Sequence, residues 1–215
     1  MPTLAMAAGP PPISTDDKSL DFALQFAKAK TVFTYSNGVS ADTTLQWIGI
    51  TWYERFAPRF ELGLYGGRAL LTQTGNTATA GLEPHGYYAG FGFRAVLLET
   101  SALQLFLHAT YTYQRVEQDN NGQSITLLWD EPRVQLGAAF APIGRLRVFG
   151  GGAWGSLEGQ ERVTGALAQT RDFERRGRSG GFFGLDLAVE RDGYIGIEAR
   201  SGIERGGEIF FKKRF

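Results

Sequence analysis

The sequence of 215 residues contains no cysteine and only two histidines, which excludes several kinds of chemical site. Without thiols there is no disulfide, no catalytic cysteine and no cysteine-ligated zinc or iron–sulfur centre. His85 and His108 alone leave little for a histidine-rich metal site. The 22 basic and 22 acidic residues cancel, whereas a general nucleic-acid binder needs a basic surplus. We therefore expect no metal, no cofactor and no nucleic-acid partner.

Long apolar runs are also missing, because no segment approaches the roughly 18 apolar residues that mark a transmembrane helix. The chain is instead rich in glycine, with 29 residues, roughly twice the usual share of about 7%. Aromatic residues make up 13%. Abundant glycine and aromatic residues without long helical segments indicate β-structure.

The first 17 residues differ in composition from the rest, being rich in proline and small residues. Residues 4–8 resemble the end of a secretory signal peptide, where small residues precede the cleavage point. The basic and most of the apolar parts of such a signal are missing. We expect either a signal-peptide remnant or a plain disordered leader, with residues 10–12 as a stiff proline spacer. The folded domain is then predicted to span 18–215.

From Phe22 onward the sequence divides into segments with alternating apolar and polar residues. The predicted strands are 22–35, 43–54, 59–73, 85–98, 102–117, 124–140, 145–158, 178–190, 193–202 and 208–215. Short separators alternate with longer polar ones, the longest being the predicted loop 159–178. An even strand number with short turns at one end and long loops at the other is typical of transmembrane β-barrels. We predict an all-β, closed, antiparallel, up-and-down barrel of about ten strands, with eight as the alternative.

Two segments fit this pattern less well. Residues 16–30 also have helical spacing, but we favour a strand because a closed barrel needs this segment beside the last strand. In residues 124–133 the alternation is expected to change face near Trp129. A bulge is predicted at Pro132, which has no N–H to donate to a neighbouring strand.

The two faces of the predicted strands differ in a way that favours an apolar exterior. In 85–98, Phe91 and Phe93 share one face, and Gly92 and Arg94 share the other. Glycines on an inner wall would make room for long charged side chains of neighbouring strands. The predicted lumen charge network comprises Glu61, Arg94, His108, Arg133, Arg147, Asp186, Glu190, Glu198 and Arg200. With the apolar face inside, the chain would instead be a soluble ligand-binding β-barrel.

The segment 208–215 (EIFFKKRF) alternates apolar residues and ends in phenylalanine. It resembles the final strand of Gram-negative outer-membrane β-barrel proteins, with Ile209, Phe211 and Phe215 carrying the pattern and Lys213 departing from it. The resemblance implies an outer-membrane location among lipid and lipopolysaccharide, with this strand as the signal read by the barrel-assembly machinery. It also implies that envelope proteins could be partners.

The function expected of a barrel this narrow is not that of an open porin, which uses about 16–18 strands. We predict a lumen largely filled by side chains and a structural, surface-interaction or narrow-conduit role, not an enzyme. A lipid-modifying hydrolase using His108 is the alternative, and it would need a nucleophile and an orienting acid within hydrogen-bond reach of this histidine. His85 is predicted to be a loop residue. Arginines of the loop 159–178 could bind lipopolysaccharide phosphates; they are Arg162, Arg171, Arg175, Arg176 and Arg178.

Overall fold

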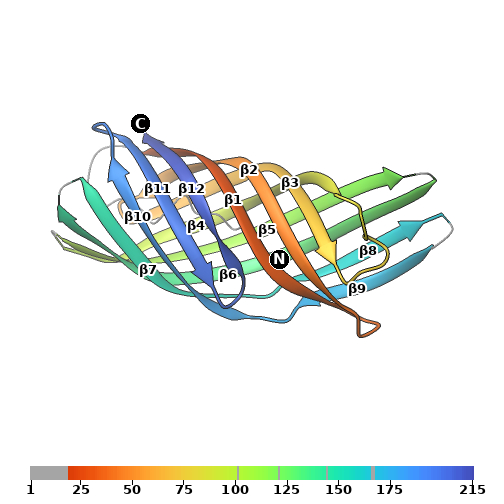
Figure 1. The fold of residues 1–215 in the computed structure, drawn as a ribbon. Helices are drawn as coiled ribbons and strands as arrows, with labels where there is room; N and C mark the ends of the chain where they lie inside the picture. The colour runs from red at the N-terminus through yellow and green to blue at the C-terminus, as the bar shows by residue number, and fades with distance from the viewer. Residues whose placement is uncertain (1–18, 101, 121, 144, 166–167) are drawn as a thin grey trace.

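The structure, a computed structural model, describes residues 19–100, 102–120, 122–143, 145–165 and 168–215, so the predicted leader lies outside the described residues. In the described residues twelve antiparallel strands form one sheet (Figure 1). They are β1 (Leu20–Tyr35), β2 (Ser40–Ala57), β3 (Phe60–Thr74), β4 (His85–Glu99), β5 (Leu103–Asn120), β6 (Gln123–Ile143), β7 (Leu146–Gly155), β8 (Glu158–Thr164), β9 (Gln169–Arg175), β10 (Ser179–Ala188), β11 (Gly193–Ser201) and β12 (Arg205–Arg214). No helix in this part of the chain is long and apolar enough to cross a membrane.

Ten of these described strands close into a ring. Strands β1 to β7 pair in sequence order, β7 then pairs with β10, and β11 and β12 follow. Strand β12 closes the ring against β1, from Asp21↔Arg214 to Lys30↔Arg205. Closure pairs the backbone of every strand on both sides, which a surface facing hydrocarbon requires. The predicted ten-stranded barrel is thereby confirmed, including a strand in place of the helix considered for residues 16–30.

The prediction that residues 159–178 form a loop is wrong, because they contain the hairpin β8–β9. Strand β8 pairs with β6 from Ser124↔Thr164 to Asp130↔Glu158. Strand β9 pairs with β8 and also with β1, from Phe33↔Arg175 to Tyr35↔Phe173. Strands β1 to β6 together with β8 and β9 thus form an eight-stranded ring that continues one end of the ten-stranded ring (Figure 1). The connections at the opposite end, such as β2–β3 and β10–β11, are short as predicted.

Strand β6 keeps one face throughout, contrary to the prediction for residues 124–133. Trp129 points inward, and the register with β5 is unbroken along its length. Pro132 lies where β6 passes from β7 to β8, whose pairings end at Arg133↔Gly155 and Asp130↔Glu158. A residue without an N–H donor fits this interruption better than a paired position.

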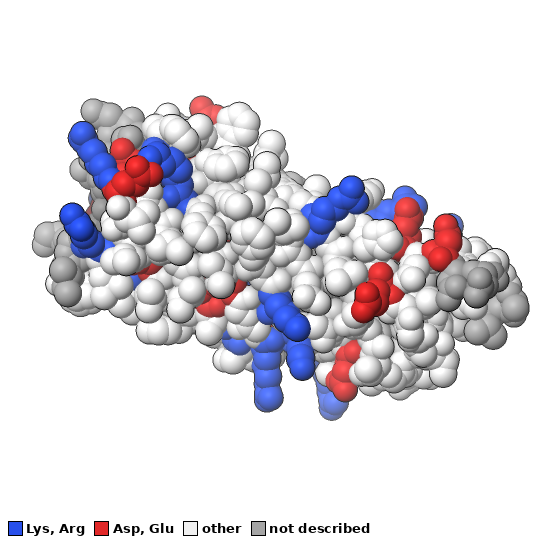
Figure 2. All heavy atoms as spheres, turned by 45° about the horizontal axis from the view of Figure 1, so that its top comes forward, with Lys and Arg blue, Asp and Glu red and all other residues white. Residues whose placement is uncertain are grey.

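Apolar side chains cover the outside of the ten-stranded ring, as the alternation predicts. Exposed examples come from strands all around it: Phe22, Ile50, Leu64, Phe91, Leu136, Phe183, Ile197 and Phe211. In the described part of β8 and β9 no large apolar side chain is exposed. On the face in Figure 2, charged side chains lie toward the two ends and in a group of Lys and Arg that projects from the lower edge between them, and uncharged surface fills much of the rest. This apolar belt contradicts the alternative of a soluble barrel with an apolar interior.

Inward-facing glycines make room mainly for aromatic rings of neighbouring strands, where we expected charged side chains. A Cβ atom added to Gly63 would lie 2.5 Å from the Tyr53 ring. One added to Gly90 would lie 2.5 Å from the Tyr65 ring. The abundant glycine and the abundant aromatic residues therefore belong to one packing arrangement, because a neighbour without a side chain leaves room for a ring in a narrow interior.

We expect Gly63→Val to destabilise the folded barrel by roughly 1–3 kcal/mol, because the new side chain would overlap the Tyr53 ring. Urea unfolding in detergent micelles, followed by tryptophan fluorescence, measures this change. Gly181→Val is the matched control. Gly181 points outward on β10, and the nearest atom that a Cβ would meet is 3.4 Å away. Equal losses in the two variants would contradict this account of the inward glycines.

Candidate functional site

The lumen near the short-turn end is occupied by two buried ion clusters. Arg94 on β4 is 1% exposed and donates to Asp21 at 2.9 Å and to Glu61 at 3.4 Å. Its guanidinium carbon lies 3.6 Å from the centroid of the Tyr53 ring. Arg147 on β7 pairs with Asp186, its register partner on β10. Each buried charge has an opposite charge beside it, which burial requires.

His108 lies next to the first cluster and is held at both ring nitrogens. Its Nε2 lies 2.8 Å from the Tyr53 hydroxyl, and its Nδ1 lies 3.0 Å from Oε1 of Gln135. The side chain is 1% exposed. A general base must lie within hydrogen-bond reach of the proton that it removes from a substrate, and a ring buried to this degree gives a substrate no access.

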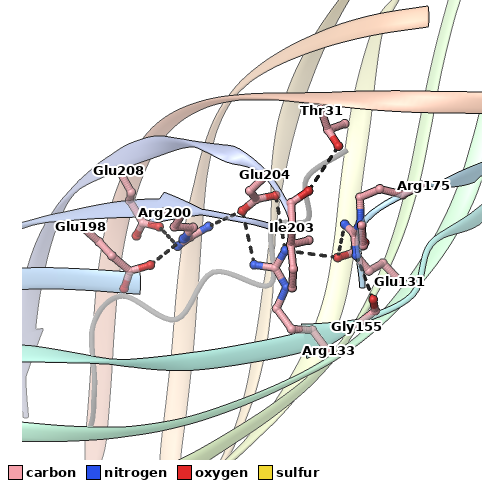
Figure 3. Close-up of polar contacts among 11 residues, drawn as sticks. Thr31, Glu131, Arg133, Gly155, Arg175, Glu198, Arg200, Ile203, Glu204 and Glu208 are labelled. Atoms are coloured by element: carbon pink, nitrogen blue, oxygen red, sulfur yellow. Dashed lines mark hydrogen bonds and ion pairs between the residues drawn. The ribbon is translucent and has the colours of Figure 1, made fainter. Parts of the chain in front are cut away.

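A chain of alternating charges crosses the lumen further along the barrel (Figure 3). Arg200 on β11 contacts Glu198 at 2.5 Å, Glu208 at 2.7 Å and Glu204 at 3.4 Å. Glu204, in the β11–β12 turn, also accepts from Arg133 on β6 at 3.3 Å. The chain therefore ties the last hairpin of the ring to the opposite wall.

The same chain continues to the place where the wall changes from ten strands to eight. Glu131 on β6 accepts from Arg133 at 3.3 Å and from Arg175 on β9 at 2.9 Å. Arg175 also donates to the carbonyls of Gly155 at 3.2 Å and Gly177 at 3.0 Å. These carbonyls lie at the end of β7 and between β9 and β10. Arg175 thus satisfies backbone groups where the strands bend, and buried backbone groups need such partners.

Two apolar clusters fill the lumen on either side of these charges. One lies inside the ten-stranded ring and contains four phenylalanine side chains. It consists of Ala23, Phe106, Ala139, Phe149, Ala153, Phe182, Ile203 and Phe210. The other lies largely inside the eight-stranded ring, where Phe33 stacks on Phe173 with centroids 4.6 Å apart and Trp129 packs edge-on against both. The described side chains thus alternate polar and apolar layers along the barrel.

A polar cluster caps the far end of the eight-stranded ring. Asn76, in the β3–β4 connection, donates to Glu161 at 2.6 Å and accepts from Arg171 at 2.8 Å. The Tyr35 hydroxyl donates to Glu161 at 3.0 Å. Burial and, after it, the Glu161 carboxylate raise the pKa of the Tyr35 phenol above its ordinary range. This cluster lies beyond the apolar belt and holds the β3–β4 connection over the end of the barrel.

Of the residues predicted for the lumen network, all but Glu190 point inward. Glu190 is exposed and pairs with Lys213 at 2.7 Å, because β10 ends at Ala188 and Glu190 belongs to the connection after it. The sequence reasoning missed Asp21, Glu131, Arg175, Glu204, Glu208, Lys212 and Arg214. Alternation about Ile209 and Phe211 could have placed Glu208, Lys212 and Arg214 inward.

The arginines proposed for lipopolysaccharide divide into two groups. Arg171 and Arg175 point inward and pair with Glu161 and Glu131, so they do not face the membrane. Arg162, Arg176 and Arg178 are exposed. His85 is exposed at the first residue of β4. In the described residues no group of histidine, aspartate and glutamate side chains is arranged to hold a metal ion.

Comparison with known proteins shows the fold alone. No protein-family model and no curated protein sequence matches this chain. The outer membrane protease OmpT from Escherichia coli is similar in structure, with 13% identity and a TM-score of 0.51 over 94% of this chain and 98% of that one. The translocator domain of the autotransporter NalP from Neisseria meningitidis has 12% identity and a TM-score of 0.51 over 94% and 91%. The chain has the fold of Gram-negative outer-membrane β-barrels.

We expect Arg133→Leu to destabilise the barrel by about 3–5 kcal/mol, because Glu131 and Glu204 would each lose a buried counter-charge. Urea unfolding in lipid vesicles measures the loss. The control is Arg115→Leu, which removes an exposed ion pair with Glu117 at 2.7 Å and should change stability little. A tolerated Arg133→Leu substitution would show that the buried chain of charges is dispensable for folding.

Proposed function

We propose that the protein is an integral outer-membrane barrel with a closed lumen, serving as a structural and recognition element at the cell surface. The alternation of ion clusters and apolar layers along the lumen carries this proposal. A permeant ion would have to leave water at the apolar layers and then compete with buried charges that are already paired with one another. The narrow conduit considered from the sequence is therefore disfavoured.

The eight-stranded ring supports the surface role. It stands beyond the apolar belt at the end with the longer connections, which faces the cell exterior in barrels of this kind. Its outer face carries polar side chains such as Arg115, Glu117 and Arg162, while Phe33, Trp129 and Phe173 pack inside it. A rigid β-scaffold that holds polar surface and connections away from the membrane suits binding to envelope proteins or to other macromolecules.

We assign no catalytic step to His108, because its side chain is buried in the wall of the filled lumen, where a substrate does not reach it. Strand β12 is the proposed assembly signal, with Ile209, Phe211 and Phe215 pointing outward where the barrel-assembly machinery could read them. One edge of β12 pairs with β11, and the opposite edge pairs with β1 to close the ring. Recognition of β12 before closure would therefore use the same backbone groups that later pair with β1.

In planar lipid bilayers the wild-type protein is expected to show no discrete conductance steps over a wide voltage range. The comparison variant combines Phe106→Ser, Phe149→Ser and Phe210→Ser, which removes three of the four aromatic rings of one apolar layer and should admit water and ions. Steps from the wild type would refute a closed lumen and would restore the narrow conduit.

Surface exposure can be tested by single-cysteine labelling, because the chain has no cysteine of its own. Glu117→Cys and Glu190→Cys replace matched exposed carboxylates, each in a surface ion pair, at opposite ends of the barrel. A membrane-impermeant maleimide should label residue 117 in intact cells and residue 190 only after the outer membrane is permeabilised. The reverse pattern would place the eight-stranded ring in the periplasm, and labelling of neither would argue against an outer-membrane location.

A further inference from the structure

The outer wall formed by β12, β1, β2 and β3 carries a group of cations at the extracellular edge of the apolar belt. Lys28 and Lys30 point outward on β1, just beyond Phe26. Arg205 on β12 is the register partner of Lys30. Arg68 points outward on β3 as the register partner of Ile48. On the face in Figure 2, a group of Lys and Arg side chains projects from the edge of the uncharged surface.

Among the described residues these cations form no ion pair with a carboxylate. Lys30 and Arg205 lie directly opposite each other, and like charges in that position destabilise a strand pair. Within the described residues neither of them, nor Lys28 or Arg68, takes part in an ion pair. The nearby outward carboxylate of Asp42 is in register with Val32, further toward the extracellular end. An external anion between Lys30 and Arg205 would relieve this repulsion.

Two grooves run in series along the same wall. The first, of ≈ 860 Å³, is largely apolar and includes Phe26, Ile48, Leu70, Ile197 and Ile209, with Lys28 and Arg68 among its lining. The second, of ≈ 780 Å³, lies further toward the extracellular end. It is more polar than the first, and its lining includes Thr44, Thr72 and Thr74 together with the cations Lys30, Arg176 and Arg205 and the carboxylates Asp42 and Glu204. An apolar groove, a band of cations and a hydroxyl-rich groove thus follow one another in the direction of the membrane normal.

We propose that this wall binds one phosphorylated glycolipid of the outer leaflet, the lipid A part of lipopolysaccharide. An acyl chain lies in the apolar groove, a phosphate bridges Lys30 and Arg205, and sugar hydroxyls meet the threonines of the polar groove. Charge complementarity and the threonine-lined groove select this occupant over an ordinary phospholipid, whose headgroup offers no phosphorylated sugar. The site uses only the outer wall, so it is independent of whether the lumen is closed.

This site differs from the one expected from the sequence. Of the five arginines in residues 159–178, only Arg176 contributes to it, because Arg171 and Arg175 are committed to ion pairs inside the barrel. The lysines of β1 were hidden by the pattern, since each looks like an ordinary polar residue within a strand. Only the register of β12 against β1 brings Arg205 to Lys30.

The test is binding of bisphosphorylated lipid A to the full-length protein in phosphatidylcholine nanodiscs, with dephosphorylated lipid A and phosphatidylglycerol as competing lipids. The wild type should prefer bisphosphorylated lipid A over both. The variant Lys28→Gln/Lys30→Gln/Arg205→Gln should bind it about tenfold more weakly or worse. The control Arg59→Gln/Arg145→Gln/Arg191→Gln removes the same charge from exposed positions at the short-turn end and should bind like the wild type.

A second variant separates binding from folding. Arg205→Glu places a carboxylate opposite Lys30, so the strand pair should be at least as stable as in the wild type while lipid A binding falls. Weaker binding in this variant and in the triple glutamine variant, with the control unchanged, supports the site. The proposal is overturned if phosphatidylglycerol binds as well as lipid A, if the control loses binding equally, or if Arg205→Glu binds like the wild type.

Discussion

Hydrocarbon offers the backbone no hydrogen-bonding partner, and the pairing of β12 with β1 is how this chain meets that constraint. Closure with ten strands in turn limits the width of the interior. In so small a space many aromatic rings lie beside a glycine, as Tyr53 does beside Gly63. Charged groups fit only as mutually paired clusters, as Arg94 does with Asp21 and Glu61. The filled lumen and the unusual composition both follow from closing the ring.

The strands that cross the apolar belt could be predicted because lipid on one side and a packed lumen on the other impose strict alternation. Strands β4 and β5 have the two faces that the sequence indicates, with Phe91 outside and His108 inside. The β8–β9 hairpin could not be found in this way. Water contacts its outer face, so Glu158–Thr164 shows no apolar row and its charges read as a loop. Because that hairpin was read as a loop, Arg175 was assigned to lipopolysaccharide, and its buried partner Glu131 was missed.

The buried charges do more than fill space. Replacing buried ion pairs by apolar side chains often leaves the stability of a protein unchanged or raises it. We therefore infer that these pairs act mainly by selecting one arrangement of the strands. Arg175 binds Glu131 and also the carbonyls at the end of β7 and between β9 and β10. Only the wall that bends at both places brings these three acceptors together. The series of ion pairs from Glu208 to Arg175 thereby fixes where the wall passes from ten strands to eight (Figure 3).

The change from ten strands to eight separates a part of the protein that is surrounded by lipid from a part that is surrounded by water. Every strand of the ten-stranded ring crosses the membrane, so lipid constrains its outward side chains. Strands β8 and β9 instead pair with residues 124–130 of β6 and 33–35 of β1, in water beyond the membrane. Over evolutionary time the hairpin can therefore be lengthened, shortened or exchanged as a unit without altering the register of the membrane-embedded strands. A population of cells under immune or phage pressure could vary what it displays while conserving how the barrel inserts.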